Sequence, residues 1–290
     1  MTILAIAQSC GTRLQLPAIA SVVGNTDNNV ILLQAMMLRT ALELRDEYPW
    51  PELQREYTFL LTTNTDSYAL PADEDRLQVA TLWNRTQHWP LIGPVDPILW
   101  QQYKSGLIVS LPRQRYRVKG WGINEFFIDP TPDSSIAGQT MVYEYITKTV
   151  FRPKTWAAST AFAALSYCSY NANIYQTSAG GTTGSTAPTW TTGTQSDGVV
   201  SWTFISAAYE TIIADTDEFI LDPKLLIDGT VWRFLESRGL DFEGIKQIAE
   251  DQKDNAKTHL IGSDVPSLRA RKYGVPPIGP WSFPEGNYGI

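Results

Sequence analysis

Apolar side chains recur at close to the 3.6-residue period of an α-helix in several parts of the chain. In residues 26–48 this period is carried by Val30, Leu33, Met37, Leu38, Ala41 and Leu44. Polar side chains at 26–28 offer oxygens that cap a first turn, and Pro49 disfavours helix at the residue before it. The pattern therefore predicts a long amphipathic helix that ends just before Pro49.

Four more segments carry helix signals. Residues 95–106 and 221–239 each have Asp followed by Pro at their second and third positions and end on Gly, which are start and stop signals of helices. Residues 241–260 place apolar side chains roughly along one face and charges on the other. The first stretch, MTILAIAQSC (1–10), has no basic side chains, so it predicts a first helix and not a signal peptide.

Between these helices the pattern changes to the alternation of β-strands. Residues 57–71 alternate like a hairpin with a turn at 64–67. Residues 116–132 predict a second hairpin, whose turn contains Gly120 and Gly122, and 141–150 predicts a strand of that same sheet. The order of helices, strands and helices predicts an α+β fold, a helical bundle with a small β-sheet part.

A polar stretch interrupts this core. From Arg152 to Ser206 the charged side chains are Arg152, Lys154 and Asp197 only, and the stretch is rich in Gly, Ser and Thr. If this stretch were removed, the segments before and after it, 141–150 and 210–219, would form one continuous piece of ordinary mixed sequence. We therefore expect an inserted all-β module whose two ends meet in one loop of the host. Its strands are predicted at 162–170, 172–178 and 198–206.

These boundaries divide the chain into four predicted parts. The core comprises residues 1–152 and 207–262, and the inserted module comprises 153–206. Residues 263–290 contain five prolines and several glycines, so they exclude a helix or a central strand and predict an extended C-terminal arm.

The arm carries the residues that most suggest a partner. Trp281 and Phe283 are anchors of the kind that fill pockets on another protein. Arg269, Arg271 and Lys272 make a local positive patch in an acidic chain and favour an acidic partner surface. Ordering a free segment costs roughly 1–2 kcal/mol per residue, and prolines lower that cost. A terminus without a function is the alternative.

Aromatic side chains are spaced along the inserted module: Trp156, Tyr175, Trp190 and Trp202. A module of about fifty residues is close to the lower size limit for independent folding, so it needs most of these rings as its core. One or two exposed rings that stack on sugar faces are the alternative.

Composition removes several classes of function. The net charge of −7 argues against a protein that grips nucleic acid, although DNA can pass a surface of like sign. Two cysteines, Cys10 and Cys168, and two histidines are too few for a disulfide framework or a zinc site. No apolar run reaches membrane-spanning length. We expect no membrane association, no metal and no cofactor.

Motifs for nucleotide binding, metalloprotease and serine hydrolase chemistry are missing from the sequence. Carboxylates gather at 73–75 and at Asp215, Asp217 and Glu218, and two acids that flank a sugar bond can hydrolyse it. Helix caps or a solvated face explain such acids equally well. No catalytic residue is predicted, and a glycoside hydrolase of the cell envelope stays an alternative.

The module shows four short motifs in order: WAASTAF (156–162), YQTSAGGTTG (175–184), PTW (188–190) and DGVVSW (197–202). They resemble a small β module that is found inserted in phage structural proteins and has a carbohydrate-binding-like fold. The resemblance implies a decoration of the surface more than a lectin.

The host sequence resembles the head-to-tail adaptor family of tailed bacteriophages, the tail accessory or head completion factors. The resemblance rests on four motifs: SVVGNTDNNV (21–30), REYTFLLTTNTDSYALPADEDRL (55–77), TLWNRTQHWPLIGPVDPILWQ (81–101) and DTDEFILDPKLLIDGTVWRFLESRGLDFE (215–243). It implies a helical bundle with a small β part that forms a dodecameric ring beneath the portal protein, with C-terminal arms running up along the portal.

The resemblance and the arm together predict a structural virion protein and not an enzyme. Its expected partners are the portal ring, other copies of itself, a distal tail or nozzle protein, and viral DNA that passes through the channel without specific binding. It would be made in the host cytoplasm and act at the head–tail interface of the virion. The alternative function is display of the module, which would recognise a glycan or another virion component.

Overall fold

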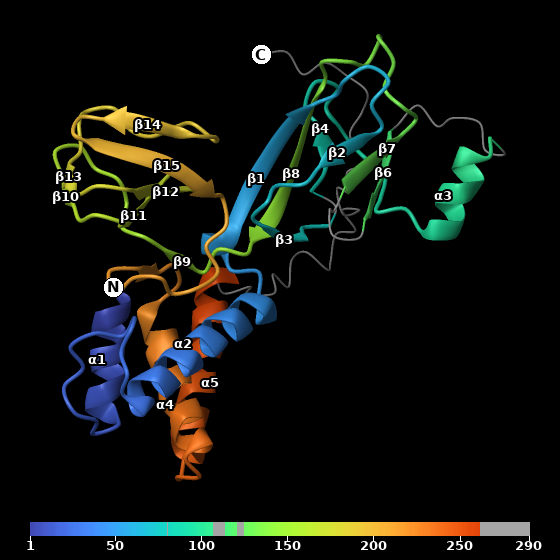
Figure 1. Ribbon diagram of the computed structural model, residues 1–290. Coiled ribbons are helices and arrows are strands. Elements are labelled where there is room, and N and C mark those ends of the chain that lie inside the picture. Colours follow the sequence, from blue (N-terminus) through green and yellow to red (C-terminus); the bar gives the residue numbers. More distant parts are fainter. Residues whose placement is uncertain (80, 107–113, 121–124, 262–290) are drawn as a thin grey trace. The chain divides into compact units, whose positions relative to one another are not determined.

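The computed structural model describes residues 1–79, 81–106, 114–120 and 125–261 (Figure 1). Within these residues the chain is a mixed α+β protein with five helices and several small antiparallel sheets, as predicted. It divides into two compact units. We call them the larger unit, Met1–Gln54, Pro71–Arg76 and Ile146–Leu260, and the β unit, which contains Arg55–Leu70 and Leu77–Tyr145.

This division differs from the predicted order of parts. The middle of the predicted first core part, 1–152, forms the β unit, while the predicted module 153–206 belongs to the larger unit. The boundaries at 152, 206 and 262 stay predictions.

The five helices form where local sequence signals place them. They are α1 (Ile3–Arg13), α2 (Asn28–Glu47), α3 (Pro97–Lys104), α4 (Pro223–Ser237) and α5 (Glu243–Ile261). Three of them begin with an aspartate whose carboxylate accepts a backbone N–H of the first turn, at 2.7 to 2.9 Å: Asp27, Asp96 and Asp222. Such caps satisfy N–H groups that have no partner inside the helix, so these predicted starts are confirmed.

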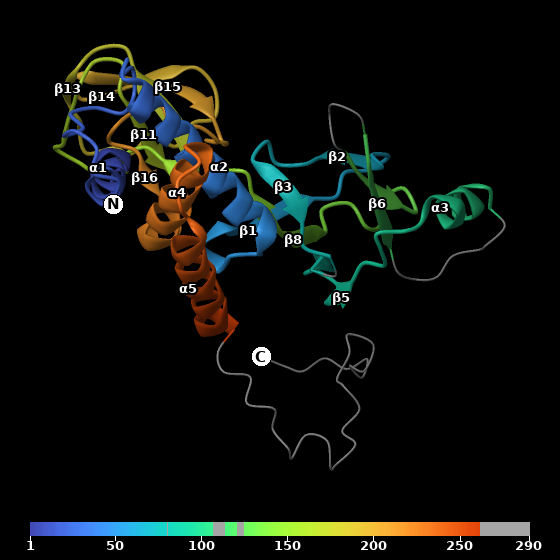
Figure 2. The ribbon, with the colours of Figure 1, turned by 90° about the horizontal axis from the view of Figure 1, so that it is seen from below.

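Helices α1, α2, α4 and α5 lie together in the larger unit and make its helical core (Figure 1, Figure 2). The buried faces of α1, α2 and α4 form one continuous apolar cluster. Gly229 of α4 lies against Thr40 of α2, where an added Cβ would come within 2.4 Å of the threonine methyl carbon. The glycine therefore allows the two helices to approach closely.

The β unit carries most of two sheets. The first has the order β1 (Gln54–Leu60), β8 (Thr140–Thr147), β4 (Trp83–Asn84) and β5 (Trp89–Pro90), and β3 (Glu74–Leu77) also pairs with β8. The second has the order β2 (Ser67–Ala69), β7 (Glu125–Asp129) and β6 (Arg115–Lys119). A buried cluster of aromatic and aliphatic side chains forms its core.

Two predictions about strand pairing were wrong. The segment 57–71 does not form a hairpin, because β1 pairs with β8 while β2 pairs with β7. The strand predicted at 141–150 forms as β8, but it lies in a different sheet from β6 and β7. Alternation specifies which face of a strand is buried and not which strand lies beside it. The predicted pairing of β6 with β7 is confirmed, and residues 121–124 of its turn lie outside the described residues.

The strands of the inserted module predicted at 172–178 and 198–206 are confirmed. The prediction of one strand at 162–170 was wrong, because a turn divides this segment into two strands that lie in different sheets. A sheet of four strands has the order β11 (Tyr167–Tyr170), β12 (Asn173–Thr177), β15 (Val200–Ser206) and β14 (Thr194–Asp197). A small second sheet pairs β10 (Ala161–Phe162) with β13 (Gly181–Thr182).

The two ends of the module lie side by side. Strand β9 (Phe151–Arg152) pairs with β16 (Glu218–Phe219). The backbone N–H of Tyr209 donates to the Thr149 hydroxyl at 3.1 Å, and that of Ile220 donates to the Val150 carbonyl at 3.1 Å. Residues on either side of the module are therefore neighbours in space, which is the arrangement that an insertion into one loop requires.

Deletion of residues 153–206, with Arg152 joined to Ala207 by a short Gly-Ser linker, is expected to leave the helical core folded. The module contributes Ile174 and Tyr167 to the apolar cluster of the helical core, so the deletion should still cost about 2–3 kcal/mol of unfolding free energy. Helical circular dichroism and thermal unfolding measure both effects. Ile174→Ala in the intact chain is the control for the packing loss, and a deletion variant without helical signal would contradict the expectation.

Candidate functional site

The predicted partner-binding residues of the arm, Arg269, Arg271, Lys272, Trp281 and Phe283, lie outside the described residues. Their role stays a prediction. The last element before them is helix α5, which ends at Ile261. The contacts of α5 therefore determine how the start of the arm is attached to the protein.

Helix α5 packs on the helical core with little apolar burial. From Glu243 to His259 no side chain is buried, and Ile245 and Ala256 are the partly buried apolar residues of the helix that pack against the core cluster. A surface helix usually gains most of its stability from one buried apolar face. Other interactions must therefore contribute to holding α5 in place.

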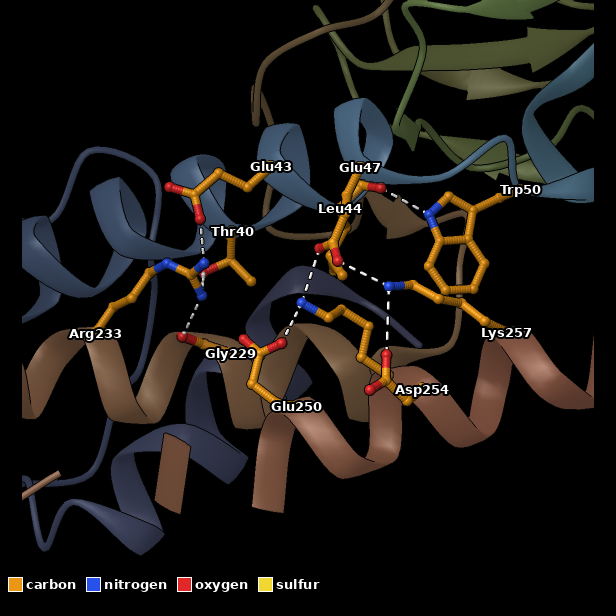
Figure 3. A network of polar contacts seen from close by, with 11 residues as sticks. Thr40, Glu43, Leu44, Glu47, Trp50, Gly229, Arg233, Glu250, Asp254 and Lys257 are labelled. Carbon is orange, nitrogen blue, oxygen red and sulfur yellow. Dashed lines mark hydrogen bonds and ion pairs between the residues drawn. The ribbon is translucent and has the colours of Figure 1, made fainter. Parts of the chain in front are cut away.

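Ion pairs between α5 and α2 supply this attachment (Figure 3). Both oxygens of the Glu47 carboxylate on α2 are used: Lys253 Nζ lies 2.8 Å from one and Lys257 Nζ 2.7 Å from the other. Within α5, Lys253 also pairs with Glu250, and Lys257 lies 3.5 Å from Asp254. One glutamate thus joins two successive turns of α5 to α2.

A second set of charges joins α2 to α4 one turn away (Figure 3). Glu43 accepts from Arg39 at 2.7 Å and also pairs with Arg233 of α4. The Arg233 guanidinium donates to the Gly229 carbonyl at 2.9 Å as well. The three helices are therefore connected by a polar network along one side of α2.

The pKa values follow from these contacts. Partial burial raises the pKa of Glu47, but the hydrogen bonds from Lys253 and Lys257 outweigh it and hold the pKa below its ordinary value. Glu43 behaves in the same way with Arg39 and Arg233. Because both folded-state pKa values are depressed, their stabilising contribution is present above the ordinary glutamate pKa and is lost as the pH falls through the folded value.

The sequence indicated the charged face of α5 but not its partner. Lys253 and Lys257 are four residues apart and so share one side of a helix. That spacing was the available signal for a common acidic partner. It did not identify Glu47, which lies about two hundred residues earlier in the chain.

Glu47→Gln is expected to loosen α5 while the rest of the helical core stays folded. Exposed ion pairs contribute up to about 1 kcal/mol each, and Glu47 makes two of them with a side chain that is 41% exposed. Amide hydrogen exchange in α5 should become about fivefold faster, the factor that corresponds to about 1 kcal/mol. The difference from the unchanged protein should shrink at high salt.

Glu52→Gln is the matched control, because Glu52 is exposed and makes no ion pair with any described residue. Exchange in α5 should not change in that variant. Equal exchange in Glu47→Gln and the unchanged protein would contradict the attachment by Glu47. A uniform increase over α1, α2 and α4 would show that Glu47 supports the whole core.

The four aromatic residues singled out in the module gather in its core cluster. Trp202 and Tyr175 are fully buried, with exposed fractions of 0%, while Trp156 and Trp190 are partly buried. Trp202 meets Phe162 edge to face at a centroid distance of 5.0 Å, and Tyr175 meets Trp190 at 5.5 Å. These rings therefore provide the apolar packing of the module.

Polar contacts fix two of the rings. The indole N–H of Trp156 donates to the Asp197 carboxylate at 2.8 Å, and the Tyr175 hydroxyl donates to the Trp190 carbonyl at 2.9 Å. A fully buried ring has no face for a sugar, which removes Trp202 and Tyr175 from any stacking platform. Trp156 and Trp190 keep part of their surface exposed.

The carboxylate clusters are parts of structural networks. Asp217 is fully buried and accepts from the Tyr209 hydroxyl at 2.8 Å and from the backbone of Ile213 and Ala214 at 2.9 Å each. Burial raises the pKa of Asp217, although these three hydrogen bonds oppose the shift. In the other cluster, Asp73 accepts from the Thr147 hydroxyl at 2.8 Å.

Asp215 joins distant parts of the chain. Its Oδ1 accepts the backbone N–H groups of Val22 and Val23 at 2.9 and 2.8 Å. Nearby, the backbone N–H of Ile3 donates to the carbonyl of Asp217 at 2.7 Å. The segment that follows the module therefore holds the N-terminal helix and the loop before α2.

Neither cysteine has the properties of a reactive thiol. Burial raises the pKa of both the Cys10 and the Cys168 thiol to about 12, so they stay protonated and unreactive near neutral pH. Over the described residues there is no group of three or more His, Cys, Asp or Glu that could hold a metal ion. Among the helices described here, none is long and apolar enough to cross a membrane.

Comparison with known proteins adds no assignment: no protein-family model and no curated protein matches this sequence.

Proposed function

We propose that this protein is a structural component of a tailed-phage virion, a head-to-tail adaptor. It forms a ring, a dodecamer, that docks beneath the portal protein through its C-terminal arms and surrounds part of the DNA channel. It has no catalytic role and uses no cofactor. Its other partner is a distal tail or nozzle protein below the ring.

One observation carries the proposal. Two of the four motifs that resemble the adaptor family, 21–30 and 215–243, lie at opposite ends of the chain and meet in the helical core. Asp215 of the last motif binds the backbone of Val22 and Val23 in the first. Each motif also leads into a helix that its own aspartate caps, Asp27 for α2 and Asp222 for α4. The motifs thus make one structural element, as the members of a family signature should.

The attachment of α5 also supports the proposal. An arm that docks on a partner needs a base with a defined position, and α5 has one through Glu47 and its two lysines. Because these contacts are ionic and partly exposed, α5 can adjust its position at a lower cost than a helix with a buried apolar face.

The overall charge suits a channel wall. A net charge of −7 gives DNA phosphates little to bind, so DNA can slide past during packaging and ejection. The buried state of Trp202 and the structural roles of Asp215 and Asp217 favour this function over glycan display by the module and over glycoside hydrolysis.

The experiment that tests the proposal mixes the full-length chain with the purified portal ring of the same phage and measures the mass of the product. We expect the portal to gain one copy of this chain for each of its subunits. Sedimentation of the chain without portal serves as the control for self-assembly. A portal whose mass does not change at saturating concentrations of the chain would overturn the adaptor assignment.

A further inference from the structure

An open groove lies on the β unit, and the sequence analysis singled out none of the residues named here as a candidate binding site. Its volume is about 430 Å³, and the side chains at its edge and floor include those of Glu56, Trp83, Arg85, His88, Val142 and Glu144. All of these residues belong to the β unit. The volume lies within the range of about 300–1,000 Å³ that is usual for ligand pockets.

Strand register explains how the groove is built. Trp83 of β4 lies directly opposite Val142 of β8, so their side chains share one face of the sheet. Glu144 is two residues further along β8 and lies on that same face. Val142 is only 5% exposed, whereas Trp83 is partly exposed and Glu144 is exposed. The face thus combines an apolar floor, an aromatic ring and charged groups.

Arg85 and Glu56 provide a polar side of the groove. The Arg85 guanidinium lies 2.6 Å from the Glu56 carboxylate of β1, and β1 and β4 flank β8 in the sheet. The ion pair therefore reaches across β8. An arginine that only donates and carboxylates that only accept are brought together beside the aromatic ring.

Backbone and hydroxyl contacts hold these groups in place. The backbone N–H of Arg85 donates to the Thr140 carbonyl at 2.9 Å, and that of Glu144 donates to the Thr81 hydroxyl at 3.0 Å. The turn between β4 and β5 is fixed by Asn84, whose side chain accepts from the backbone of Gln87 at 3.0 Å. A site on strands and a braced turn loses little conformational entropy when a ligand binds.

The chemistry of the lining selects one class of ligand. Neighbouring hydroxyls of a sugar ring need donors and acceptors side by side, and the apolar face of the ring needs a flat aromatic surface. Two carboxylates against one arginine disfavour phosphates and acidic sugars. Charged groups around the floor disfavour a purely apolar ligand, because they would be left without partners.

We propose that this groove binds a neutral oligosaccharide, with Trp83 as the stacking surface and with Arg85, Glu56 and Glu144 as hydrogen-bonding partners of its hydroxyl groups. The residues that carry this proposal belong to neither the inserted module nor the arm. It does not rest on the adaptor assignment, since the full-length protein can be tested for sugar binding without a portal.

The test is calorimetric titration of the full-length protein with three neutral hexasaccharides: maltohexaose, cellohexaose and chitohexaose. We expect at least one to bind with a Kd of about 1 mM or tighter. Trp83→Ala should weaken that binding at least about tenfold. Because Trp83 is partly buried, Glu144→Gln and Arg85→Met are measured as well, since both alter exposed side chains. Each should weaken the binding of the sugar about threefold or more, which in free energy is about half of a tenfold effect.

Trp190→Phe in the module is the matched aromatic control and should leave the affinity unchanged. Binding that Trp190→Phe abolishes, while the three groove variants keep it, would place the sugar on the module and overturn the proposal. Absence of binding to all three hexasaccharides would overturn it too. The proposal would also be overturned if the chain self-associates, binds no sugar, and loses this self-association in Trp83→Ala. That result would show that a second copy of the chain covers the groove.

Discussion

Truncation after Gly262 is expected to abolish loading onto the portal ring and to leave the rest of the protein folded. The last described helix, α5, ends at Ile261, and all the described residues of the two apolar clusters precede that position. The removed segment contains the two aromatic anchors and the three cationic residues that the sequence predicts to contact the partner. The truncated chain should keep its circular dichroism spectrum and its thermal unfolding transition.

The expected effect is large because the arms act together. When one arm of a ring binds the portal, the remaining arms are held close to their own sites, so weak single contacts add up to tight binding. Loss of all arms should therefore remove binding completely at concentrations where the full-length chain saturates the portal. The mass of the portal mixed with each chain measures this directly.

Substitutions within the arm serve as controls. Trp281→Ala with Phe283→Ala removes the anchors, while Arg269→Ala with Lys272→Ala lowers the charge and keeps the anchors. We expect the first pair to weaken loading at every salt concentration, whereas the second should matter mainly at low salt. A truncated chain that loads as well as the full-length chain would show that another surface binds the portal.

Trp202→Ala is expected to unfold the inserted module. Trp202 is fully buried and packs edge to face on Phe162. Replacing a buried Trp by Ala costs about 3–5 kcal/mol. Domains have about 0.05–0.15 kcal/mol of stability per residue, or about 3–8 kcal/mol for a module of about fifty residues. The substitution should therefore remove most of the stability of the module.

Limited proteolysis combined with hydrogen exchange should locate the effect in residues 153–206. Trp190→Ala is the matched control, since Trp190 is only partly buried, and it should cost about 1–2 kcal/mol and leave the module folded. The helical core should stay protected in both variants. Protection of 153–206 that is the same in Trp202→Ala and in the unchanged protein would contradict the role of Trp202 as the centre of the module.

Local signals predicted the helices well. Asp27, Asp96 and Asp222 cap helices at the expected places because a cap depends only on the residue itself and the next few backbone N–H groups. The module strands predicted at 172–178 and 198–206 formed for a similar reason, since alternation is a local pattern. The pairing of the neighbouring strands β6 and β7 was predicted as well. The pairing of β1 with β8 was not, because these strands lie far apart in the sequence and pair through long-range contacts.

The candidate sites likewise divide into those with a local sequence signal and those that depend on contacts between distant residues. Trp202 and Tyr175 were expected to serve the core of a small module or to bind sugar, and their burial places them in the core. The contact of Glu47 with Lys253 and Lys257 and the groove at Trp83 and Glu144 had no complete sequence signal. Each depends on two or more elements that meet only in the folded chain.

The sequence by itself determined the helices and their caps, the β character of the module and the α+β class, because hydrophobic period and capping act over a few residues. Only the tertiary structure decided which distant strands pair, that Asp215 binds the backbone of Val22 and Val23, and that α5 is attached through Glu47. These contacts join residues far apart along the chain, and their energies depend on distances and burial that the order of residues does not contain.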